Sequence, residues 1–432
     1  MRVQALPPHQ RTIWWRSAAA APATTPLAGS GRFDVAVVGA GFTGLTAAWH
    51  LARRGARVVL LEAGRIASGA SGLNAGFVVP SFAKADPADV IAALGEERGS
   101  CLLALVGAGA DRVFGTIRDH AIDCDAEQAG WMHVAHSAQM LQALGVRVEA
   151  WQRLGRPVRL LDERAARALS GTRHCHGALF DPSGGTLHPL NYAYGLARLA
   201  MAAGCVIHEN ATVRDVQRHG RGWQLQAGGH LLQAEQVLLC THAAEPGIAR
   251  RLSRVVLPLR VVQLATRPLA AAVVRRISPQ RTPVADTRAN LFTYRLDRED
   301  RLISGAMPML GHGAEGRIGP MIARRLQHEL QLPEQPPVEC VWRGRAAMTT
   351  DFLPHLYEFG PGFIGGVGCN GRGIGLTAML GEVLADAATG RQWDELPVTK
   401  ASTEPLPLRA LAGAATAAAV ARARWQDWRQ GL

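Results

Sequence analysis

The sequence is poor in lysine, in closely spaced cysteines and in long apolar runs, and each shortage excludes a class of protein. Only Lys84 and Lys400 are lysines, so almost all of the 47 basic residues are arginines. The arginines are scattered singly or in pairs, with no basic block interleaved with aromatic residues. This pattern argues against a nucleic-acid partner despite the net charge of +12. The charge permits at most a mild attraction for acidic substrates.

No stretch approaches the roughly 18 consecutive apolar residues that a membrane-spanning helix requires, so no membrane span is expected. Residues 1–30 hold Trp14, Trp15 and Arg16 ahead of a short run of small residues, which is a poor match to a signal peptide. The seven cysteines include no Cys-x-x-Cys pair. That usage indicates free thiols, no metal site and a cytoplasmic location.

One short region reads as a strand, a helix and a second strand. The run Phe33–Val38 (FDVAVV) is short and nearly uncharged, as in a strand that is buried on both faces. Gly44–Arg54 carries apolar residues at helical spacing, and Val58–Glu62 (VVLLE) is a second strand. These three segments fit one right-handed βαβ unit.

Beyond this unit the pattern alternates between helical and extended segments. Helices are predicted at Pro87 to about Ala121, Tyr192–Ala203, Met321–Leu330 and Gly375–Thr389. Strands are predicted at Trp131–His136, in a more exposed sheet, and at Gly204–Glu209, Gln236–Cys240, Leu291–Leu296, Leu302–Ala306 and Phe363–Gly368. The Ala- and Arg-rich segment Leu408–Leu432 fits either a surface helix or a frayed tail.

At 432 residues the chain is too long for one ordinary core, so two closely joined domains are expected. The fold class predicted is α/β, with a discontinuous Rossmann-like βαβ domain and an inserted antiparallel-sheet substrate domain. The predicted division is an N-terminal arm at 1–30, a cofactor-binding domain at 31–80, 190–250 and 345–395, a substrate domain at 81–189 (in part) and 251–344, and a C-terminal tail at 396–432.

The turn between the first strand and the helix has the pattern Gly-x-Gly-x-x-Gly. Gly39 permits the tight turn, Gly41 lets a pyrophosphate approach the backbone, and Gly44 lets the helix pack closely on the strand. The helix N-terminus supplies N–H groups and a partial positive charge for the phosphates. Glu62, at the end of the second strand, should accept hydrogen bonds from an adenosine ribose and would repel a 2′-phosphate. A dinucleotide other than NADP is therefore expected.

The first motif fits both NAD and FAD, and two later stretches favour FAD. Ala67–Gly76 (ASGASGLNAG) has small residues that let a loop pass close to a planar ring. Gly365–Gly373 (GGVGCNGRG) opens another helix, whose N-terminus would stabilise negative charge on a reduced flavin. The side chains of Ser68, Ser71 and Asn74 offer polar contacts in the first stretch, and Arg372 adds a positive charge in the second.

With these motifs the chain resembles the D-amino acid oxidase superfamily, and within it the glycine oxidase, sarcosine oxidase and gamma-glutamylputrescine oxidoreductase branch. The resemblance covers about residues 10 to 395. It rests on DVAVVGAGFTGLTAAWHLARRGARVVLLEA, GASGLNAG, GGTLHPLNYAYGLA, the Cys240–His242 strand end and FIGGVGCNGRGIGLT. It implies an extended FAD with its adenine near Thr212 and Val213, and the oxidation of a small amine or amino acid by hydride transfer to the flavin.

Twenty residues are expected to bind this cofactor. They are Gly39, Gly41, Phe42, Thr43, Gly44, Glu62, Ala63, Ser68, Ser71, Asn74, Ala75, Gly76, Val213, Thr241, Gly368, Asn370, Gly371, Arg372, Gly373 and Ile374.

The chain departs from the family pattern at three places. Sarcosine oxidases attach flavin to a cysteine, but the matching stretch Arg343–Asp351 (RGRAAMTTD) has none, so the resemblance implies noncovalent FAD. Cys340 is out of register, and Cys369 is interpreted as a packing residue. The strand that carries an oxygen-activating lysine in some relatives corresponds to Arg301–Met307 (RLISGAM) and lacks one, which leaves oxygen or another electron acceptor open. Leu73 stands where the glutamylputrescine branch often has arginine.

Hydride removal from a neutral amine needs few catalytic side chains. Arg372, placed beside the pyrimidine carbonyl, and His355 are the catalytic candidates, and His133, His136 and His188 are weaker ones. An arginine of the inserted sheet would clamp a substrate carboxylate, and the choice among Arg288, Arg295 and Arg298 stays open. The alternatives are a noncatalytic or regulatory FAD-binding protein, a dehydrogenase with another acceptor, and an NAD-dependent dehydrogenase. The substrate and the oligomeric state are not indicated.

Overall fold

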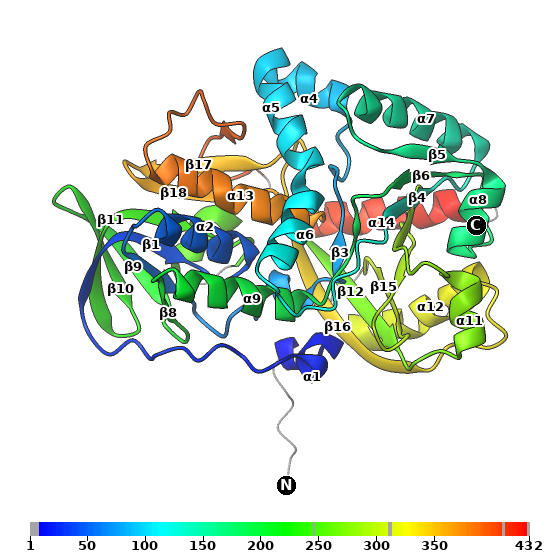
Figure 1. Cartoon of the computed structure of the whole chain (residues 1–432), viewed down its shortest axis with the longest axis horizontal. Helices are drawn as coiled ribbons and strands as arrows, with labels where there is room; N and C mark the ends of the chain where they lie inside the picture. Colours follow the sequence, from blue (N-terminus) through cyan, green and yellow to red (C-terminus); the bar gives the residue numbers. More distant parts are fainter. Residues whose placement is uncertain (1–7, 245–246, 310–312, 408–410, 430–432) are drawn as a thin grey trace, which may run out of the picture.

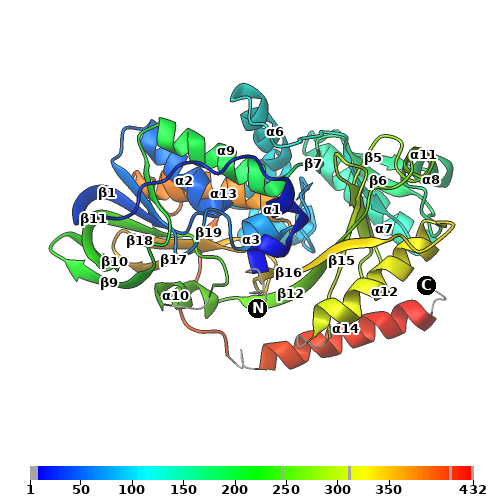
Figure 2. The same ribbon diagram turned by 90° about the horizontal axis from the view of Figure 1, so that it is seen from below.

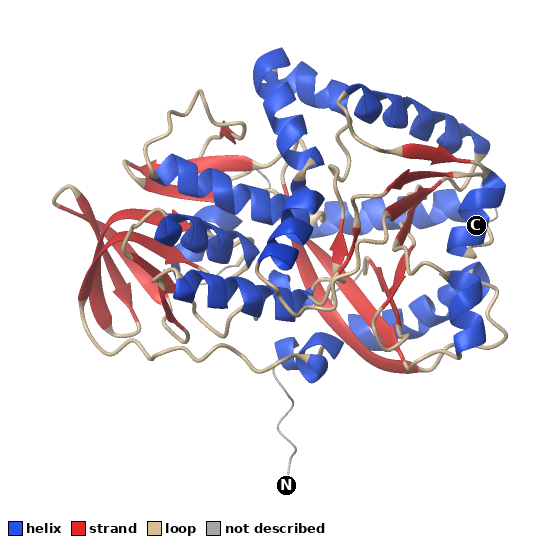
Figure 3. Ribbon diagram, in the orientation of Figure 1, coloured by secondary structure: helices blue, strands red, loops and turns tan. Residues whose placement is uncertain are grey.

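Two β-sheets lie side by side with helices packed over them (Figures 1 and 3). The computed structural model describes residues 8–244, 247–309, 313–407 and 411–429. The fold is α/β, with one largely parallel sheet and one largely antiparallel sheet, which confirms the class expected from the sequence.

The first sheet carries the βαβ unit. Its strand order is β19-β17-β18-β11-β1-β2-β8, with β10 paired to β11 and β9 paired to β10. The strands are β1 (Gly31–Val38), β2 (Val58–Leu61), β8 (Val206–His208), β9 (Val213–His219), β10 (Gly222–Ala227), β11 (His230–Leu239), β17 (His355–Gly360), β18 (Phe363–Val367) and β19 (Thr399–Lys400). Strands β18, β11, β1, β2 and β8 run parallel.

The second sheet has the order β16-β12-β15-β14-β13-β4-β6-β5. Its strands are β4 (Trp131–Val134), β5 (Arg159–Leu161), β6 (Ala178–Asp181), β12 (Leu257–Thr266), β13 (Val284–Asp286), β14 (Thr293–Leu296), β15 (Leu302–Ala306) and β16 (Val338–Met348). All these pairings are antiparallel except that of β13 with β4. A further pair joins β3 (Phe77–Val78) to β7 (Gly185–Thr186).

The helices lie over both sheets. They are η1 (Pro8–Arg11), α1 (Ile13–Ser17), α2 (Phe42–Arg53), α3 (Ala70–Leu73), α4 (Pro87–Leu94), α5 (Glu96–Gly107), α6 (Gly109–Asp119), α7 (Ala138–Arg153), α8 (Glu163–Ser170), α9 (Pro189–Ala202), η2 (Gly247–Ala249), α10 (Arg250–Ser253), α11 (Ala271–Ile277), α12 (Ala314–Glu329), α13 (Gly373–Ala388) and α14 (Ala412–Arg429). Within the described ranges no single helix is long and apolar enough to cross a membrane, and only the bent pair α5 and α6 passes that test together.

Helix α2 is buried because it packs between α9 and α13, as Figure 1 shows. A Cβ added to Gly381 of α13 would lie 2.6 Å from the carbonyl oxygen of Thr43. Only glycine therefore lets the two helices approach so closely, and this contact fixes the N-terminus of α2 relative to α13.

Two segments differ from the sequence-based expectations, and a third had been left open between two alternatives. Strand β4 was expected in a more exposed sheet, but Trp131, Met132 and Val134 are buried because β4 lies between β13 and β6. The helix predicted at Met321–Leu330 begins about two turns earlier, at Ala314. Of the C-terminal segment, Ala412–Arg429 forms the helix α14 rather than a frayed tail; it lies along the edge of the molecule in Figure 2 and packs against β12, while residues 408–410 and 430–432 lie outside the described residues.

The N-terminal arm is part of the core. Ile13 and Trp14 are each 1% exposed, and they pack into the same apolar cluster as α2 and α9. The domain boundaries given above stay a prediction, because the two sheets share this packing. The seven cysteines, all among the described residues, are free.

A buried ion cluster braces the second sheet. Arg288 pairs with Asp286 at the end of β13 and with Glu329 at the end of α12, and the Arg288–Glu329 distance is 2.7 Å. Glu329 also accepts a hydrogen bond from His174. Burial alone would raise the pKa of Glu329, but the hydrogen bond and charge of Arg288 lower it to about 2. The carboxylate therefore contributes stability above its ordinary pKa and loses it as the pH falls from about 4.5 towards 2.

Replacing Glu329 by glutamine tests this cluster. At pH 7 we expect the free energy of unfolding of Glu329→Gln to fall by about 3 kcal/mol, because Arg288 keeps only one buried carboxylate partner. Urea titrations from pH 7 to pH 3 should show a weaker acid dependence than in the wild type. The control Glu163→Gln alters an exposed ion pair and should change stability by less than about 1 kcal/mol. Equal curves for Glu329→Gln and the wild type would contradict the assignment.

Candidate cofactor and active site

A cavity of about 960 Å3 is lined by residues from both sheets. Its walls come from the β1–α2 turn, the segment after β2, strands β12 to β15, helix α7 and the loop before α13. Small-molecule sites are usually concave, largely apolar and of up to roughly this size. The cavity is therefore the candidate site for a cofactor and a substrate together.

The glycine turn at one end of the cavity tolerates no side chain at its third glycine. A Cβ on Gly44 would lie 1.9 Å from the carbonyl oxygen of Gly39. Gly39 itself has φ of +107°, a conformation that favours glycine. A Cβ on Gly41 would lie 3.0 Å from Oγ of Ser71, and that hydroxyl accepts the N–H of Phe42. The turn thus presents bare backbone at the N-terminus of α2.

Glu62 is held at the same end by backbone N–H groups. Its Oε2 accepts from Ala40 and its Oε1 from Gly64, both at 2.8 Å. Burial raises the pKa of Glu62, and the two N–H groups oppose that rise. Each oxygen keeps a further lone pair that is able to accept a hydroxyl of a bound ribose.

Two tryptophans hold the loop that follows. Nε1 of Trp342 donates to the carbonyl oxygen of Leu73 at 3.0 Å, and Nε1 of Trp14 donates to that of Asn74 at 2.7 Å. The side chain of Asn74 bridges within the loop, because its Nδ2 donates to the Ser71 carbonyl and its Oδ1 accepts the Gly76 N–H. The loop is thereby fastened from α1, from β16 and from within.

Arg295 holds the next two carbonyls of the loop. Its Nη1 donates to Ala75 at 3.3 Å, to Gly76 at 3.1 Å and to Leu187 at 2.8 Å. Gly76 has φ of +77°, and a Cβ there would lie 2.3 Å from Nη1 of Arg295. Burial lowers the pKa of Arg295 to about 10. Its guanidinium is thus committed to the backbone.

The other two arginines proposed for a carboxylate clamp are also paired. Arg288 belongs to the buried ion cluster, and Arg298 is exposed and bonds Asp125 at 3.1 Å. None of the three arginines from the inserted sheet therefore presents a free guanidinium to the cavity.

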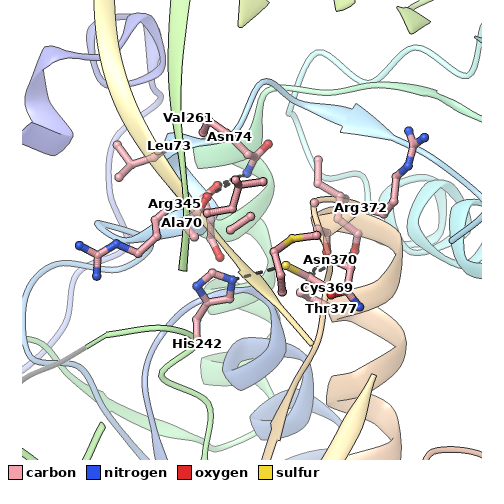
Figure 4. Close-up of a pocket in the computed structure, with 18 of the residues that line it drawn as sticks. Ala70, Leu73, Asn74, His242, Val261, Arg345, Cys369, Asn370, Arg372 and Thr377 are labelled. Atoms are coloured by element: carbon pink, nitrogen blue, oxygen red, sulfur yellow. Dashed lines mark hydrogen bonds between the residues drawn. The ribbon is translucent and has the colours of Figure 1, made fainter. Parts of the chain in front are cut away.

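The loop before α13 is built on unusual backbone conformations. Gly368 has φ of +123°, and Asn370 has φ of +49° with its Oδ1 accepting the Thr349 N–H at 2.8 Å. Figure 4 shows Cys369 beside His242, with Sγ and Nε2 3.4 Å apart. Nε2 of His242 also accepts the N–H of Ala347 at 3.1 Å, so the ring joins β16 to this loop.

Arg372 leaves this loop in a different direction from its neighbours. Figure 4 shows its side chain extending away from Cys369 and Asn370, and its Cζ lies 4.7 Å from the ring centroid of Trp131. Burial and the charge of Arg147 lower the pKa of Arg372 to about 10. Burial and the charge of Arg372 lower the pKa of His133 to about 3, so this imidazole is neutral.

The cavity brings together most of the residues expected to bind the cofactor. Those that line it are Gly39, Gly41, Phe42, Thr43, Glu62, Ala63, Ser68, Ser71, Asn74, Ala75, Val213, Thr241, Asn370, Gly371, Arg372, Gly373 and Ile374. Gly44, Gly76 and Gly368 do not line the cavity. Each packs so closely against neighbouring atoms that a Cβ would clash. Whether these residues contact a cofactor stays a prediction.

The structure does not bring His355 to the cavity lining. Its Nε2 bonds the carboxylate of Asp351 at 2.9 Å, and its Nδ1 bonds Oγ1 of Thr399 at 3.0 Å. These contacts link β17 to the neighbouring loop and to β19. A catalytic role for His355 stays a prediction without a geometric basis.

Several lining residues escaped the sequence analysis. Met140, Leu144 and Arg147 of α7 line the cavity, as do Lys84 and Asp86. Residues at positions i, i+4 and i+7 lie on one face of a helix, so the sequence could have indicated that these three residues share a face. The roles of Trp14 and Trp342 carried no such signal, because their bonds join residues 60 and 269 positions apart.

Comparison with known proteins places the chain in a family. The family described as "DAO: FAD dependent oxidoreductase" matches residues 34–387. Gamma-glutamylputrescine oxidoreductase of Escherichia coli is 30% identical over 364 residues, which are 83% of this chain and 84% of that protein. Glycine oxidase of Geobacillus kaustophilus is 26% identical over 372 residues, which are 82% of this chain and 92% of that protein.

The crystal structure of glycine oxidase from Geobacillus kaustophilus has the same fold. Its TM-score is 0.68 at 23% identity, and the match covers 84% of this chain and 95% of that one. The glycine turn, Glu62 and the cavity are thus found in a chain that matches the family over most of its length. The chain belongs to the DAO family of FAD-dependent oxidoreductases.

Proposed function

We propose that the chain binds FAD noncovalently in this cavity and oxidises the C–N bond of a small amine or amino acid. The observation that supports the proposal most is that one cavity is lined both by the cradle for a dinucleotide and by side chains of the second sheet. Relatives named for glycine and for gamma-glutamylputrescine favour an amine or amino acid substrate.

The residues present fit FAD. The bare turn from Gly39 to Gly44 and the N-terminus of α2 would hold the diphosphate, and Glu62 the adenosine ribose. Thr212 and Val213 line the same cavity, which supports the expected position of the adenine beside them. The loop from Leu73 to Gly76 and the N-terminus of α13 would hold the ring.

When bound, FAD would supply a hydride acceptor for the carbon next to the amine nitrogen, and water would hydrolyse the imine product. The chain's own part is to bind and orient the substrate and to keep water away. Met140, Leu144 and Leu291 give the cavity an apolar wall. The positive charge of Arg372 disfavours an ammonium nearby and favours the neutral amine, whose neighbouring carbon can then give up a hydride.

The molecule that reoxidises the flavin is either oxygen or another electron acceptor. Gly305, Ala306 and Met307 line the cavity at the strand where some relatives carry a lysine. Lys84 lines it from another segment and is exposed. Noncovalent binding is supported by Cys340, which is absent from the lining and whose pKa burial raises to about 11.

The ribose contact is tested by Glu62→Gln. The amide nitrogen of glutamine must face the N–H of either Ala40 or Gly64, so one donor opposes another. We expect the dissociation constant of FAD to rise about tenfold or more, measured by calorimetric titration of the FAD-free protein. The control Glu382→Gln, at a partly exposed ion pair with Arg112, should leave it unchanged. An unaltered affinity in Glu62→Gln would refute this role.

The fastening of the loop is tested by Trp14→Phe. Phenylalanine keeps the aromatic packing and removes the N–H that Asn74 accepts, so the loop loses one of its holders. We expect FAD to bind roughly five- to tenfold more weakly, measured by quenching of flavin fluorescence. The neighbouring Trp15→Phe is the matched control and should bind FAD like the wild type. Equal affinities for the two variants would show that the indole bond does not position the loop.

The reaction is tested by mixing the yellow protein without oxygen with polyamines, N-methylated amino acids and D-amino acids. At least one compound should bleach the flavin band, whereas tert-butylamine should not, because the carbon next to its nitrogen carries no hydrogen. On admission of oxygen, fast return of the band indicates an oxidase and persistence of the bleached form indicates a dehydrogenase. A band that no compound bleaches would favour a noncatalytic flavoprotein.

A further inference from the structure

Two tryptophans lie exposed on helix α14, the red helix at the lower edge of Figure 2. Trp425 is 54% exposed and Trp428 is 74% exposed, whereas the other tryptophans of the chain are buried or partly buried. An indole that stays in water forgoes the free energy that its burial would release. Exposed apolar side chains that gather among polar ones mark an interaction surface.

The helix is attached to the rest of the protein by its opposite face. Val420 and Ala423 are buried, and so is Asp427, whose carboxylate lies 4.0 Å from Arg325 of α12. Arg424 donates to the carbonyl oxygen of Met307 at 3.2 Å. Positions 420, 423, 424 and 427 share one face of a helix. The exposed residues therefore gather on the other face.

This outer face is cationic at one end and uncharged along the rest. Arg422 and Arg429 are exposed, and Cζ of Arg429 lies 4.9 Å from the ring centroid of Trp425. The only acidic residue from Ala412 to Arg429 is the buried Asp427. The other exposed positions of the helix are small residues, which are Gly413, Ala414, Ala415, Ala418 and Ala419. The charge of the face therefore favours an anionic partner.

Helix α14 also contacts segments that line the cavity. Met307, to which Arg424 donates, is a lining residue. So is Leu291, whose carbonyl oxygen accepts from Arg325 at 3.2 Å. Leu291 and Met309 are exposed as well, and Sδ of Met309 lies 3.6 Å from Arg424. Exposed apolar side chains are thus present around α14 and not only on it.

The position of α14 in the sequence separates it from the FAD-binding fold. The match to the family covers residues 34–387, and the helix begins at Ala412. What this chain shares with the family therefore does not account for the helix or for its exposed tryptophans.

The charge and shape of the outer face select among anionic partners. A second copy of the chain would bring another net charge of +12 and the same arginines, which repel one another. A nucleic acid needs cations along its path, but residues 413–419 supply none. An anionic lipid surface attracts the arginines, accepts tryptophan at the level of its headgroups, and lets the row of small residues lie close to it.

We propose that the outer face of α14 binds an anionic lipid membrane, with the helix lying on the membrane surface. Trp425 and Trp428 enter the headgroup region, and Arg422 and Arg429 lie against lipid phosphates. This interaction goes beyond the proposed function and does not depend on it, because binding is measured without turnover.

The test is flotation of the full chain with vesicles of phosphatidylcholine and phosphatidylglycerol. We expect the protein to float with these vesicles and to bind vesicles of phosphatidylcholine alone roughly tenfold more weakly or less. The double variant Trp425→Ser/Trp428→Ser should bind the anionic vesicles at least about tenfold more weakly than the wild type. The matched control Leu231→Ser, which removes an exposed apolar side chain of β11, should bind like the wild type.

The arginines are tested separately. Each of the changes Arg422→Gln and Arg429→Gln should weaken binding to the anionic vesicles roughly fivefold. The control Arg221→Gln removes an exposed arginine beside β10 and should have little effect. All these side chains are exposed, so thermal unfolding of the variants should match that of the wild type.

A second measurement needs no variant. Anionic vesicles whose lipids are brominated near the headgroup end of the acyl chains quench tryptophans that reach this depth. The emission of the wild-type protein should fall in part with these vesicles and stay unchanged with the same vesicles lacking bromine.

Three results would overturn the inference. The first is failure of the wild type to float with the anionic vesicles or to be quenched by the brominated ones. The second is equal flotation of the wild type and Trp425→Ser/Trp428→Ser, which would reduce the attraction to the net charge of the chain. The third is dimerisation, or binding of duplex DNA, that the tryptophan variant loses while vesicle binding is unaltered, which would assign the face to that partner.

Discussion

Four consecutive backbone carbonyls, from Leu73 to Gly76, are held by three side chains from distant parts of the chain. Trp14 comes from the N-terminal arm, and Trp342 and Arg295 come from two strands of the second sheet. Leaving such a carbonyl buried without a donor costs about 1–3 kcal/mol, so the three holders act on one loop. The position of this loop, which faces the cavity, therefore depends on how the N-terminal arm and the second sheet pack against the first sheet.

The charged groups of the site divide into those that serve the fold and those left for ligands. Arg295 and Arg288 are buried and fully committed to protein partners. Glu62 and Arg372 stand at separate places in the cavity and keep capacity for a bound molecule. The carboxylate of Glu62 would accept from a ribose, so that end of the cavity suits a dinucleotide. Neutral His133 beside Arg372 adds no competing charge.

The sequence predicted the strand, turn and helix around the glycine motif because this arrangement depends on local spacing. Gly39, Gly41, Gly44 and Glu62 lie within one βαβ unit, where backbone sterics and strand ends determine the arrangement. The contacts of Arg295 were beyond such reasoning, since its acceptors in the loop are 219 and 220 positions away. The sequence named it only as one of three arginines for a carboxylate clamp. The burial of β4 was also predicted wrongly. The strands β13 and β6, which pair with it on either side, are distant from it in the sequence.

The central claim is that the chain holds FAD without a covalent bond between the glycine turn and the fastened loop. The most direct measurement is the visible absorption of the protein before denaturation, and of the filtrate after the denatured chain has been removed. The account predicts a flavin band in the native protein and its full recovery in the filtrate. A protein that shows no band and gains none from added FAD, or a band that stays with the denatured chain, would contradict it.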